Sequence, residues 1–370
     1  MKILMLSNSK SIHTKRWVKA LCERGLEICL FSLNTTDDLF YSALDNVKVV
    51  NYQYCHISSN FTNSALQRFE FFKVIKIVRR IIGEFRPDIV HAHYTLDYGS
   101  IGAAVGFHPF ILSVWGSDVY GDPQLSTLSK LALRYKLRKA DMILSTSNVM
   151  AKETNKYTDK KIGITPFGVD TTRFKKTSTG VSNGKFVVGN VKTLAPKYGI
   201  DVLIKAYKLV VDRNSTLDTE LRIYGTGPCK VEYEHLAQNL GIADKVKFMG
   251  WVDNAQLPEI YSSFSVSVSV SVSDSESFGV VAVEAMACEC PVITSDADGF
   301  TEVMEDGVTG FVVPKRDVEA TADAIQKFID NPELKQKMGT AGRNRVKRLY
   351  EWNDNVQTMI NFYKDILKSK

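Results

Sequence analysis

The stretch SDSESFGVVAVEAMACECPVIT, Ser273–Thr294, decides the fold. It opens with polar residues and turns at Ser277–Gly279, after which Val280–Ala287 is apolar and rich in helix formers. Pro291 ends this segment, and Val292–Thr294 has the pattern of a buried strand. The stretch therefore predicts a polar loop, a short buried helix and a buried strand in succession.

Two carboxylates accompany this helix: Glu284 lies within the apolar segment and Glu276 lies just before it. Burying an unpaired carboxylate is costly, so Glu284 needs a partner that donates hydrogen bonds. The helix start at Gly279–Val280 presents free backbone N–H groups and a positive dipole end, which suit an anion such as a diphosphate. We expect Glu276 to contact a sugar and Glu284 a ribose diol.

The same residues carry a family resemblance. Glu276 and Glu284 have the spacing E-x7-E within ESFGVVAVEAMACECPVI. With its Phe-Gly turn and its Glu-Ala-Met-Ala…Pro-Val continuation, this segment resembles the donor-site signature of family-4 retaining glycosyltransferases, the glycosyl transferases group 1. The resemblance extends over nearly the whole chain and implies the GT-B fold. Repeated alternation of strands and helices in both halves likewise predicts two Rossmann-like, doubly wound parallel-sheet domains, facing each other across a cleft.

Length and composition agree with a globular protein of two domains. A chain of 370 residues is long for a single core, and 44% hydrophobic with 24% charged residues is ordinary for globular proteins. No apolar run approaches the roughly 20 residues that a membrane-spanning helix needs, and Met1–Ser7 indicates a first strand rather than a signal peptide. The six cysteines lack regular spacing, and Cys288-x-Cys290 indicates buried thiols rather than a metal site. A cytoplasmic location follows, with the inner membrane face as an alternative.

Charge is spread unevenly along the chain. Residues 1–170 hold 22 Lys and Arg against 15 Asp and Glu, net +7, whereas the remainder holds 25 against 26, net −1. The first half is therefore the candidate to meet an anionic partner. The basic helix expected at Leu66–Phe85 would either lie on an anionic membrane surface or pack on the core with a solvated basic face. Its basic residues are Arg68, Lys73, Lys76, Arg79 and Arg80. Nucleic acid is not an expected partner.

The first domain begins with a β-α-β pattern: a strand at Lys2–Ser7, a helix at Ser11–Gly25 and a strand at Glu27–Ser32. His13 follows the first strand, where open parallel sheets bind ligands, and is a candidate acceptor-side residue. The family usually carries a glycine pair in this loop, which Ser7–Lys10 replaces here. Residues 34–65 are expected to be irregular.

The strand Arg86–His93 resembles the D-x-x-H-x-H strand of the family, and His93 at its end is expected near the cleft. His91 and His93 lack a third ligand for a metal. In the next strand and loop, Trp115 stands where many relatives have a histidine that contacts the sugar or the donor phosphate. Tryptophan cannot perform proton chemistry, so that role is not transferred, and Trp115 is expected only as an acceptor-side residue of the cleft. Asp118 matches the H-G-x-D aspartate of the family, and either accepts a proton from an acceptor hydroxyl or caps the following turn.

The predicted domain boundaries rest on the segment ending in Gly168-Val-Asp, which resembles the P-N-G-V-D linker of the family. They give an acceptor-binding domain at 1–168, a nucleotide-sugar-binding domain at 169–352 and a final helix at 353–370, which crosses back to the first domain in relatives. Asn353 is a possible N-cap of that helix. A basic helix at Ser129–Ala140 and a strand at Asp141–Ser145 precede the linker.

Several loops of the second domain are candidates for the donor site. Lys192 and Lys197 flank a strand-to-helix loop and match the basic pair that neutralises the donor diphosphate in the family, although solvated lysines remain the alternative. Gly225 and Gly227 follow a strand, and Val252 ends a stretch that resembles the border of the nucleotide base.

Three further patterns of the second domain have structural interpretations. Ser262–Ser273 alternates serine and valine and predicts a strand buried on both faces. Asp296-Ala-Asp298 matches a D-x-D metal motif of a different fold, so a loop is expected. Gly299–Glu302 resembles the G-G-x-x-E turn of the family, with Asp298 in place of its first glycine.

The resemblance implies a retaining, metal-independent hexosyltransferase without a cofactor. Its donor would be a UDP- or GDP-sugar, and its acceptor a glycan or a polyprenyl-diphosphate-linked sugar in cell-surface polysaccharide synthesis. Front-face substitution would be helped by Lys192 and Lys197, which stabilise the departing diphosphate, and backbone groups near Phe278 and Gly279 would complete the sugar pocket. A sugar-nucleotide epimerase or hydrolase, and a non-catalytic partner subunit, remain alternatives.

Overall fold

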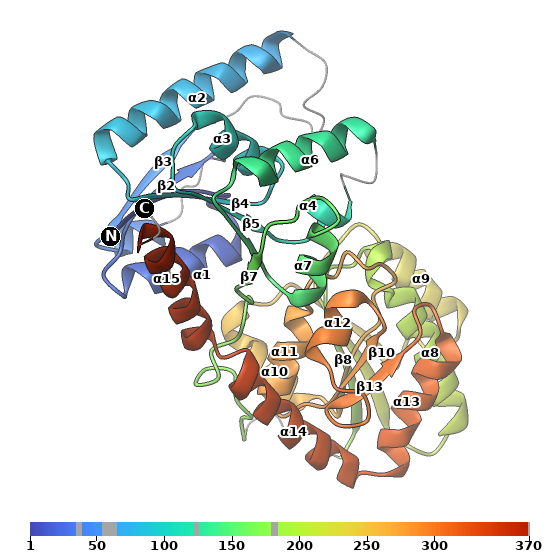
Figure 1. Ribbon diagram of the computed structural model, residues 1–370. Helices are drawn as coiled ribbons and strands as arrows, with labels where there is room; N and C mark the ends of the chain where they lie inside the picture. Colours follow the sequence, from blue (N-terminus) through green and yellow to red (C-terminus); the bar gives the residue numbers. More distant parts are fainter. Residues whose placement is uncertain (35–38, 54–64, 122–125, 179–183, 369–370) are drawn as a thin grey trace. The chain divides into compact units, whose positions relative to one another are not determined.

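The computed structural model describes residues 1–34, 39–53, 65–121, 126–178 and 184–368, with side chains from residue 70 onward in the third range. Arg68, which the sequence analysis names, and Cys55, one of the six cysteines, lie outside the described side chains. The chain divides into two compact units, Met1–Pro166 with Asn355–Lys370, and Phe167–Asp354 (Figure 1). No helix in the described ranges is long and apolar enough to span a bilayer.

Unit 1 is built on a seven-stranded parallel sheet of order β3-β2-β1-β4-β5-β6-β7. Its strands are β1 (Lys2–Leu6), β2 (Glu27–Ser32), β3 (Val47–Asn51), β4 (Ile89–His93), β5 (Phe110–Val114), β6 (Met142–Ser145) and β7 (Ile162–Ile164). The central strands β1, β4 and β5 are buried on both faces, which explains their nearly continuous apolar sequences. The order reverses between β1 and β4, so the doubly wound arrangement predicted from the sequence is confirmed.

Helices cover both faces of this sheet. They are α1 (Ile12–Cys22), η1 (Tyr41–Ala43), α2 (Ala65–Phe85), α3 (Asp97–Val105), α4 (Ser117–Tyr120), α6 (Thr127–Lys139), α7 (Asn148–Thr154) and the part of α15 (Trp352–Lys368) from Asn355 onward. On one face α3 contacts both α2 and α6 (Figure 1). The side chain of Ser126 caps α6 by accepting a hydrogen bond from Ser129 N at 3.1 Å.

Unit 2 has a six-stranded parallel sheet of order β10-β9-β8-β11-β12-β13. Its strands are β8 (Phe186–Val191), β9 (Thr219–Tyr224), β10 (Val246–Gly250), β11 (Val266–Ser269), β12 (Val292–Ser295) and β13 (Gly310–Val313). The flanking helices are η2 (Pro196–Tyr198), α8 (Ile200–Arg213), α9 (Lys230–Asn239), η3 (Asn254–Gln256), α10 (Leu257–Ser263), α11 (Val280–Ala287), α12 (Asp298–Val303), α13 (Val318–Asp330) and α14 (Glu333–Leu349). Unit 2 is therefore a second doubly wound domain with its own core.

Three local expectations were wrong. The serine-valine alternation predicts a strand over Ser262–Ser273, but β11 spans only Val266–Ser269, because the preceding residues end α10. Residues 34–65, expected to be irregular, contain η1 and the edge strand β3 in their described part. Asn353 is not the N-cap of the last helix, since α15 already begins at Trp352. Local alternation and local capping propensity are weak signals where tertiary packing sets the boundary.

Candidate active site

The turn that carries Lys197 is packed on the backbone that leads to Glu276. Gly199 follows this turn with φ +65°, and a Cβ atom there would lie 2.0 Å from Val270 O. Val272 N donates a hydrogen bond to Lys197 O at 2.9 Å. Only glycine allows this approach, so the lysine loop and the glutamate loop form one rigid assembly.

Glycines 225 and 227 have a structural role in the same assembly. Cβ atoms at these positions would lie 2.1 Å from Lys192 O and 2.3 Å from Leu194 O. Lys192 N in turn donates to Tyr224 O at 2.9 Å. The two glycines thus let the end of β9 lie against the lysine loop. Their contact with a nucleotide stays a prediction, as does that of the half-buried Val252 beyond β10.

Lys192 and Glu276 form an ion pair that the sequence analysis did not foresee. Lys192 Nζ lies 2.6 Å from Glu276 Oε2, and the two side chains are only 14% and 12% exposed. Ser271 Oγ donates to the same carboxylate oxygen at 3.4 Å. The Nζ atoms of Lys192 and Lys197 lie 4.6 Å and 4.9 Å from the ring centroid of Tyr198. Two ammonium groups and one carboxylate therefore gather here, and their net positive charge suits an anionic ligand.

The helix start at Gly279–Val280 lies where the sequence predicts it. Gly279 is the N-cap of α11 with φ +82°, and a Cβ atom there would lie 2.7 Å from Phe300 Cδ1. The Phe278 side chain is buried, with its ring centroid 5.4 Å from that of Tyr350. Gly299 N donates to Glu276 O at 2.8 Å. These contacts hold the backbone between Glu276 and α11 in place, and with it the N–H groups at the start of the helix.

Glu284 is buried in α11 and has the hydrogen-bond donor that its burial requires. Its side chain accepts a hydrogen bond from Tyr261 Oη at 3.1 Å, and the residue is 7% exposed. Burial and the nearby Glu284 carboxylate raise the pKa of Tyr261 well above its ordinary value, so the tyrosine stays a donor. The expected contact of Glu284 with a ribose diol stays a prediction.

Lys315 is a basic residue near the glutamate loop that sequence reasoning missed. Its Nζ lies 2.6 Å from Asp274 Oδ1 and 3.9 Å from Asp296 Oδ1, and these interactions raise the pKa of Lys315. Asp296 also accepts a hydrogen bond from Lys315 N at 2.9 Å. Asp296 is therefore part of an ion-pair network, and the loop expected at Asp296-Ala-Asp298 ends at Ala297, because Asp298 already begins α12. Within the described ranges, no three metal-ligating side chains lie close enough together to hold an ion.

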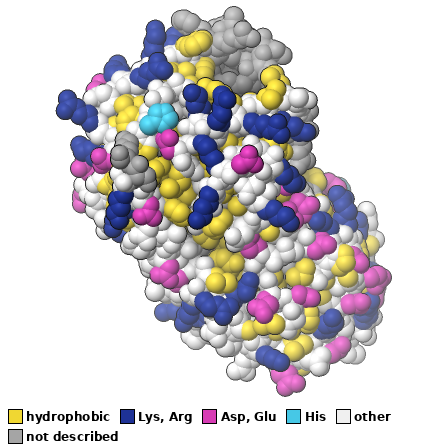
Figure 2. Space-filling model, viewed as in Figure 1, with side chains coloured by type: hydrophobic (Ala, Val, Ile, Leu, Met, Phe, Trp, Pro, Cys, Tyr) yellow, Lys and Arg dark blue, Asp and Glu magenta, His cyan; other side chains and the backbone are white. Residues whose placement is uncertain are grey.

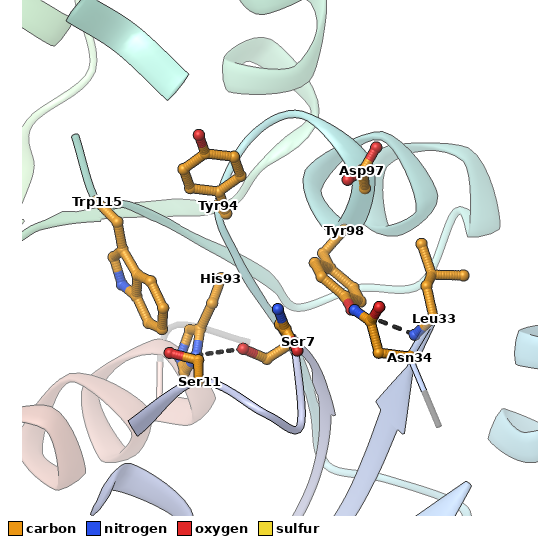
Figure 3. A pocket seen from close by; sticks show the side chains of 10 residues that line it. Ser7, Ser11, Leu33, Asn34, His93, Tyr94, Asp97, Tyr98 and Trp115 are labelled. Atoms are coloured by element: carbon orange, nitrogen blue, oxygen red, sulfur yellow. Dashed lines mark hydrogen bonds between the residues drawn. The ribbon is translucent and has the colours of Figure 1, made fainter. Parts of the chain in front are cut away.

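Unit 1 contains a cavity of about 360 Å³ at the carboxyl ends of β1, β2, β4 and β5 (Figure 3). This is the point where the strand order reverses, at which open α/β sheets bind ligands. The cavity is lined by Ser7, Asn8, Ser11, Leu33, Asn34, His93, Tyr94, Asp97, Tyr98 and Trp115. The structure thus brings His93 and Trp115, two of the predicted acceptor-side residues, into one cavity.

The aromatic wall of this cavity consists of Trp115 and His93. Their ring centroids are 4.6 Å apart, and Ser7 Oγ lies 3.2 Å from His93 Nδ1 (Figure 3). His13, the third predicted acceptor-side residue, contacts Trp115 edge-on at 6.0 Å. Burial lowers the pKa of His13 to about 4 and that of His93 well below its ordinary value. Both rings are neutral at neutral pH and add no positive charge to the cavity.

His91 lies behind His93 and is a structural residue. Its Nδ1 lies 2.7 Å from Tyr363 Oη of α15, and its Nε2 lies 2.8 Å from Ser113 Oγ. Both ring nitrogens are used, and burial lowers the pKa of His91 to about 3. The histidine pair therefore supports the core beneath the cavity.

Asp118 caps its own loop. The residue is fully buried, and its Oδ1 accepts hydrogen bonds from Gly116 N at 2.7 Å and Trp115 N at 3.2 Å. Its Oδ2 accepts one from Thr95 N at 2.9 Å. Of the two roles that the sequence left open, the geometry supports capping. Through the hydrogen bond from Trp115 N, this aspartate also holds the backbone of Trp115, and its expected catalytic role stays a prediction.

Asp97 and Asn34 are cavity residues that sequence reasoning missed. Asp97 begins α3, and burial raises the pKa of its carboxyl while the charge of Lys136 opposes this shift. Asn34 follows β2 and, like Asp97, lies on the side of the cavity away from Trp115 and His93 (Figure 3). Residues that follow β2 and β4 meet at one edge of the sheet, and only the strand order shows this. The sequence alone therefore does not indicate that Asn34 and Asp97 line the same cavity.

The fold and the sites define a protein of two doubly wound α/β units, with an anion-suited loop in one and a polar cavity in the other. The family model for glycosyl transferases group 1 matches residues 171–345, and the model for glycosyl transferase 4-like proteins matches residues 2–147. The chain therefore belongs to the group 1 glycosyltransferases and is an enzyme of that class.

Individual relatives agree with this assignment. N-acetyl-alpha-D-glucosaminyl L-malate synthase of Bacillus anthracis is 25% identical over 305 residues, covering 76% of this chain and 75% of that protein. Phosphatidyl-myo-inositol mannosyltransferase of Mycobacterium leprae is 33% identical over 174 residues, covering 47% of this chain and 45% of that protein.

Solved structures show the same fold. Sucrose-phosphate synthase from Thermosynechococcus elongatus superposes with a TM-score of 0.84 at 21% identity, covering 100% of both chains. An Anabaena protein determined in complex with UDP and glucose superposes with a TM-score of 0.79 at 20% identity, covering 99% of this chain and 100% of that one. The predicted GT-B fold is confirmed.

Proposed function

We propose that this glycosyltransferase transfers a sugar from a UDP- or GDP-sugar to a hydroxyl group with retention of anomeric configuration, and without a metal ion. One observation carries the proposal: Lys192 and Lys197 both lie over the ring of Tyr198, and Lys192 is paired with Glu276, which precedes the helix start at Gly279 by three residues. Two ammonium groups and a helix N-terminus supply the charge that a departing diphosphate needs. The complex of the Anabaena relative with UDP and glucose supports the choice of donor class.

Donor binding would exchange the partners of the ion pair. Lys192 would leave Glu276 and contact the diphosphate together with Lys197, while Glu276 would turn to the hydroxyl groups of the donor sugar. The acceptor oxygen then attacks the anomeric carbon on the face from which the diphosphate departs. The bond between the anomeric carbon and the phosphate oxygen breaks, and that departing oxygen takes the proton of the acceptor hydroxyl. The enzyme acts through preorganised charge, and no side chain has to transfer a proton.

The unit 1 cavity would hold the hydroxyl-bearing end of the acceptor. Its wall of Trp115 and His93 offers an aromatic face for a sugar ring, and Asp97 and Asn34 offer hydrogen-bond acceptors for hydroxyl groups. Among the described residues that line it, none is lysine or arginine. A neutral sugar, at the end of a glycan or of a polyprenyl-diphosphate-linked chain, fits this lining, and cell-surface polysaccharide synthesis at the inner membrane face is the setting we propose.

Nucleotide binding tests the proposal directly. Melting of the full chain is measured with UDP, GDP and ADP, each with and without EDTA. A nucleotide present at about 100 times its Kd stabilises the protein by about 2.7 kcal/mol. We expect one diphosphate of the UDP and GDP pair to raise Tm equally with and without EDTA. No shift with either nucleotide would contradict the proposal and favour a non-catalytic partner subunit.

The variant Glu284→Gln tests whether the nucleotide binds next to α11. Glutamine keeps an acceptor for Tyr261 Oη but loses the charge, so we expect the fold to survive and the nucleotide shift to shrink. Tyr261→Phe is the matched control, since it keeps the carboxyl group and removes only the hydrogen bond from Tyr261 Oη, so it measures how much of any loss comes from that bond alone. An unchanged shift in Glu284→Gln would remove Glu284 from the donor site. Release of free sugar or of an epimer without acceptor would identify a hydrolase or an epimerase instead.

A further inference from the structure

The outward face of α6 exposes large apolar side chains. Leu128, Leu131 and Tyr135 are 64%, 54% and 47% exposed, whereas Leu133 and Leu137 of the same helix are buried in the core. The helix therefore has one apolar side that packs on unit 1 and a second that meets solvent. Contiguous exposed apolar surface of this kind is typical of an interaction site.

Basic side chains surround these apolar residues. α6 contains no aspartate or glutamate, and Lys130, Arg134, Arg138 and Lys139 are all exposed. Within the described ranges, none of these four forms an ion pair with a carboxylate, and Arg138 and Lys139 lie over the ring of Tyr135. Lys160 Nζ donates to the carbonyl oxygens of Leu137 and Arg138 and so adds a further charge at the end of the helix.

The helix α2, which the sequence identified as the candidate for a membrane surface, differs from α6 in its apolar residues and in the pairing of its basic residues. Its apolar residues Val74, Ile75, Val78 and Ile81 are buried. Lys73 pairs with Glu70 at 2.8 Å, and Arg80 pairs with Glu84 at 3.7 Å. Arg79 Nη2 donates to Ala104 O at 3.1 Å. Of the two alternatives for α2, the structure supports the core-facing helix with a solvated basic face.

Both helices nevertheless contribute to one side of unit 1. α3 contacts α2 and α6 on the same face of the sheet, and Figure 2 shows Lys and Arg side chains gathered over this part of the unit. Phe72 and Lys76 of α2 are exposed as well. The outward face of α6 itself combines apolar side chains with positive charge.

We propose that the outward face of α6 docks unit 1 on the surface of an anionic lipid bilayer. Leu128, Leu131 and Tyr135 would enter the boundary between headgroups and acyl chains, and the four basic residues would contact lipid phosphates. The combination favours a membrane over a protein partner, because exposed apolar side chains share this face with basic residues and with no carboxylate, as an anionic lipid surface requires. The inference rests on the proposed function in one respect, since a lipid-linked acceptor would be presented at that surface.

Vesicle flotation of the full chain tests this docking. Vesicles of phosphatidylcholine are compared with vesicles that contain about 30% phosphatidylglycerol, because only the second carry the negative surface potential that attracts basic residues. We expect binding to the anionic vesicles alone, weakened by added salt. The quadruple variant K130Q/R134Q/R138Q/K139Q and the triple variant L128S/L131S/Y135S should each weaken it about tenfold or more.

A matched control removes the same number of charges elsewhere. K327Q/K337Q/K347Q/R348Q changes four exposed basic residues of α13 and α14 in unit 2, and its vesicle binding should stay within about twofold of the wild type. Equal loss in this control would show that net charge alone drives adsorption and would overturn the assignment to α6. Unchanged binding in the triple variant would overturn the insertion of the apolar residues.

Two further outcomes also overturn the inference. If the wild type binds neither kind of vesicle, α6 is not a membrane surface. If L128S/L131S/Y135S converts a lipid-free dimer into a monomer, the face is an interface between copies of the chain. The nucleotide-induced Tm shift, measured without vesicles, separates the two proposals: it tests the donor site alone and should be unchanged in all α6 variants.

Discussion

Lys192 and Lys197 share Tyr198 as an aromatic neighbour but differ in their other contacts. Lys192 is mostly buried and paired with Glu276, whereas Lys197 is exposed and its backbone oxygen accepts the hydrogen bond from Val272 N. Removing Lys192 would leave the mostly buried Glu276 carboxylate without its ion-pair partner. A lower rate in such a variant could then come from lost stability as well as from lost catalysis. Lys197 gives the cleaner test.

Lys197→Ala should lower kcat about 100-fold or more, because one preorganised charge contact to the departing group is lost. Since the side chain is exposed, Tm in the absence of nucleotide should change by little. Steady-state rates with the donor identified by the nucleotide panel provide the measurement. Lys205→Ala, an exposed lysine of α8 paired with Asp201, is the matched control and should keep its activity. Near-normal turnover in Lys197→Ala would exclude this lysine from leaving-group stabilisation.

At the level of single residues, the sequence predicted where charges lie but not how they pair. The carboxylates Glu276 and Glu284 were found from their spacing, and burial of Glu284 required a donor, which the structure identifies as Tyr261. The partner of Glu276 lies on a different loop, so no local pattern shows it. For Asp118 the sequence left two roles open, proton acceptor and loop cap. Capping requires that its carboxylate oxygens reach backbone N–H groups, and this depends on the fold of the loop.

Among the elements, η2 and β11 show how backbone packing builds the donor loop. The turn Pro196–Tyr198 can lie against the chain that follows β11 because Gly199 has no side chain. The serines of β11 have a related explanation, since a strand that lies between β8 and β12 and is buried on both faces accommodates small residues. Sequence alternation predicts such a strand but cannot show where the chain leaves the sheet.

Gly199→Ala should destabilise unit 2 by more than about 2 kcal/mol and weaken nucleotide binding, because the added Cβ meets a backbone oxygen at a positive φ. Gly241→Ala is the matched control: it has a similar φ of +68°, but nothing lies within 4 Å of its Cβ position. It should cost about 1 kcal/mol, from the backbone conformation alone. Denaturant unfolding measures both variants. Equal losses would show that packing on Val270 contributes nothing.

Across the whole molecule, the two units differ in their buried histidines. His91 and His93 are buried in unit 1 and His13 is half-buried there, whereas His235, in unit 2, is exposed. Parallel sheets in both units follow from the alternating pattern of the sequence, so the architecture was predictable. The stacking of three histidines with Trp115 and Tyr363 was not, because it joins β4, α1, the loop after β5 and α15.

Mild acid should therefore weaken unit 1 more than unit 2. Burial lowers the pKa of His13 to about 4 and that of His91 to about 3, while unfolded histidines titrate near their ordinary value of about 6.5. Below that value the unfolded state takes up protons that the folded state does not, so stability falls as pH drops, by on the order of 1 kcal/mol per histidine and pH unit. The raised pKa values of Asp97 and Asp118 act in the opposite direction nearer the carboxyl range. A range from about pH 7.5 to about pH 5.5 separates the two effects.

Amide hydrogen exchange, resolved by peptide and corrected for the intrinsic pH dependence, measures the opening free energies of β1, β4 and β5 against those of β8, β11 and β12. We expect the strands of unit 1 to lose protection between about pH 7.5 and about pH 5.5 while those of unit 2 keep theirs. His91→Gln should flatten the decline in unit 1, because one titrating group is removed, and His235→Gln should change neither unit. A nucleoside diphosphate added at either pH should protect unit 2, where the proposed donor loop lies. Equal loss of protection in both units would mean that the buried histidines do not control the acid stability of unit 1.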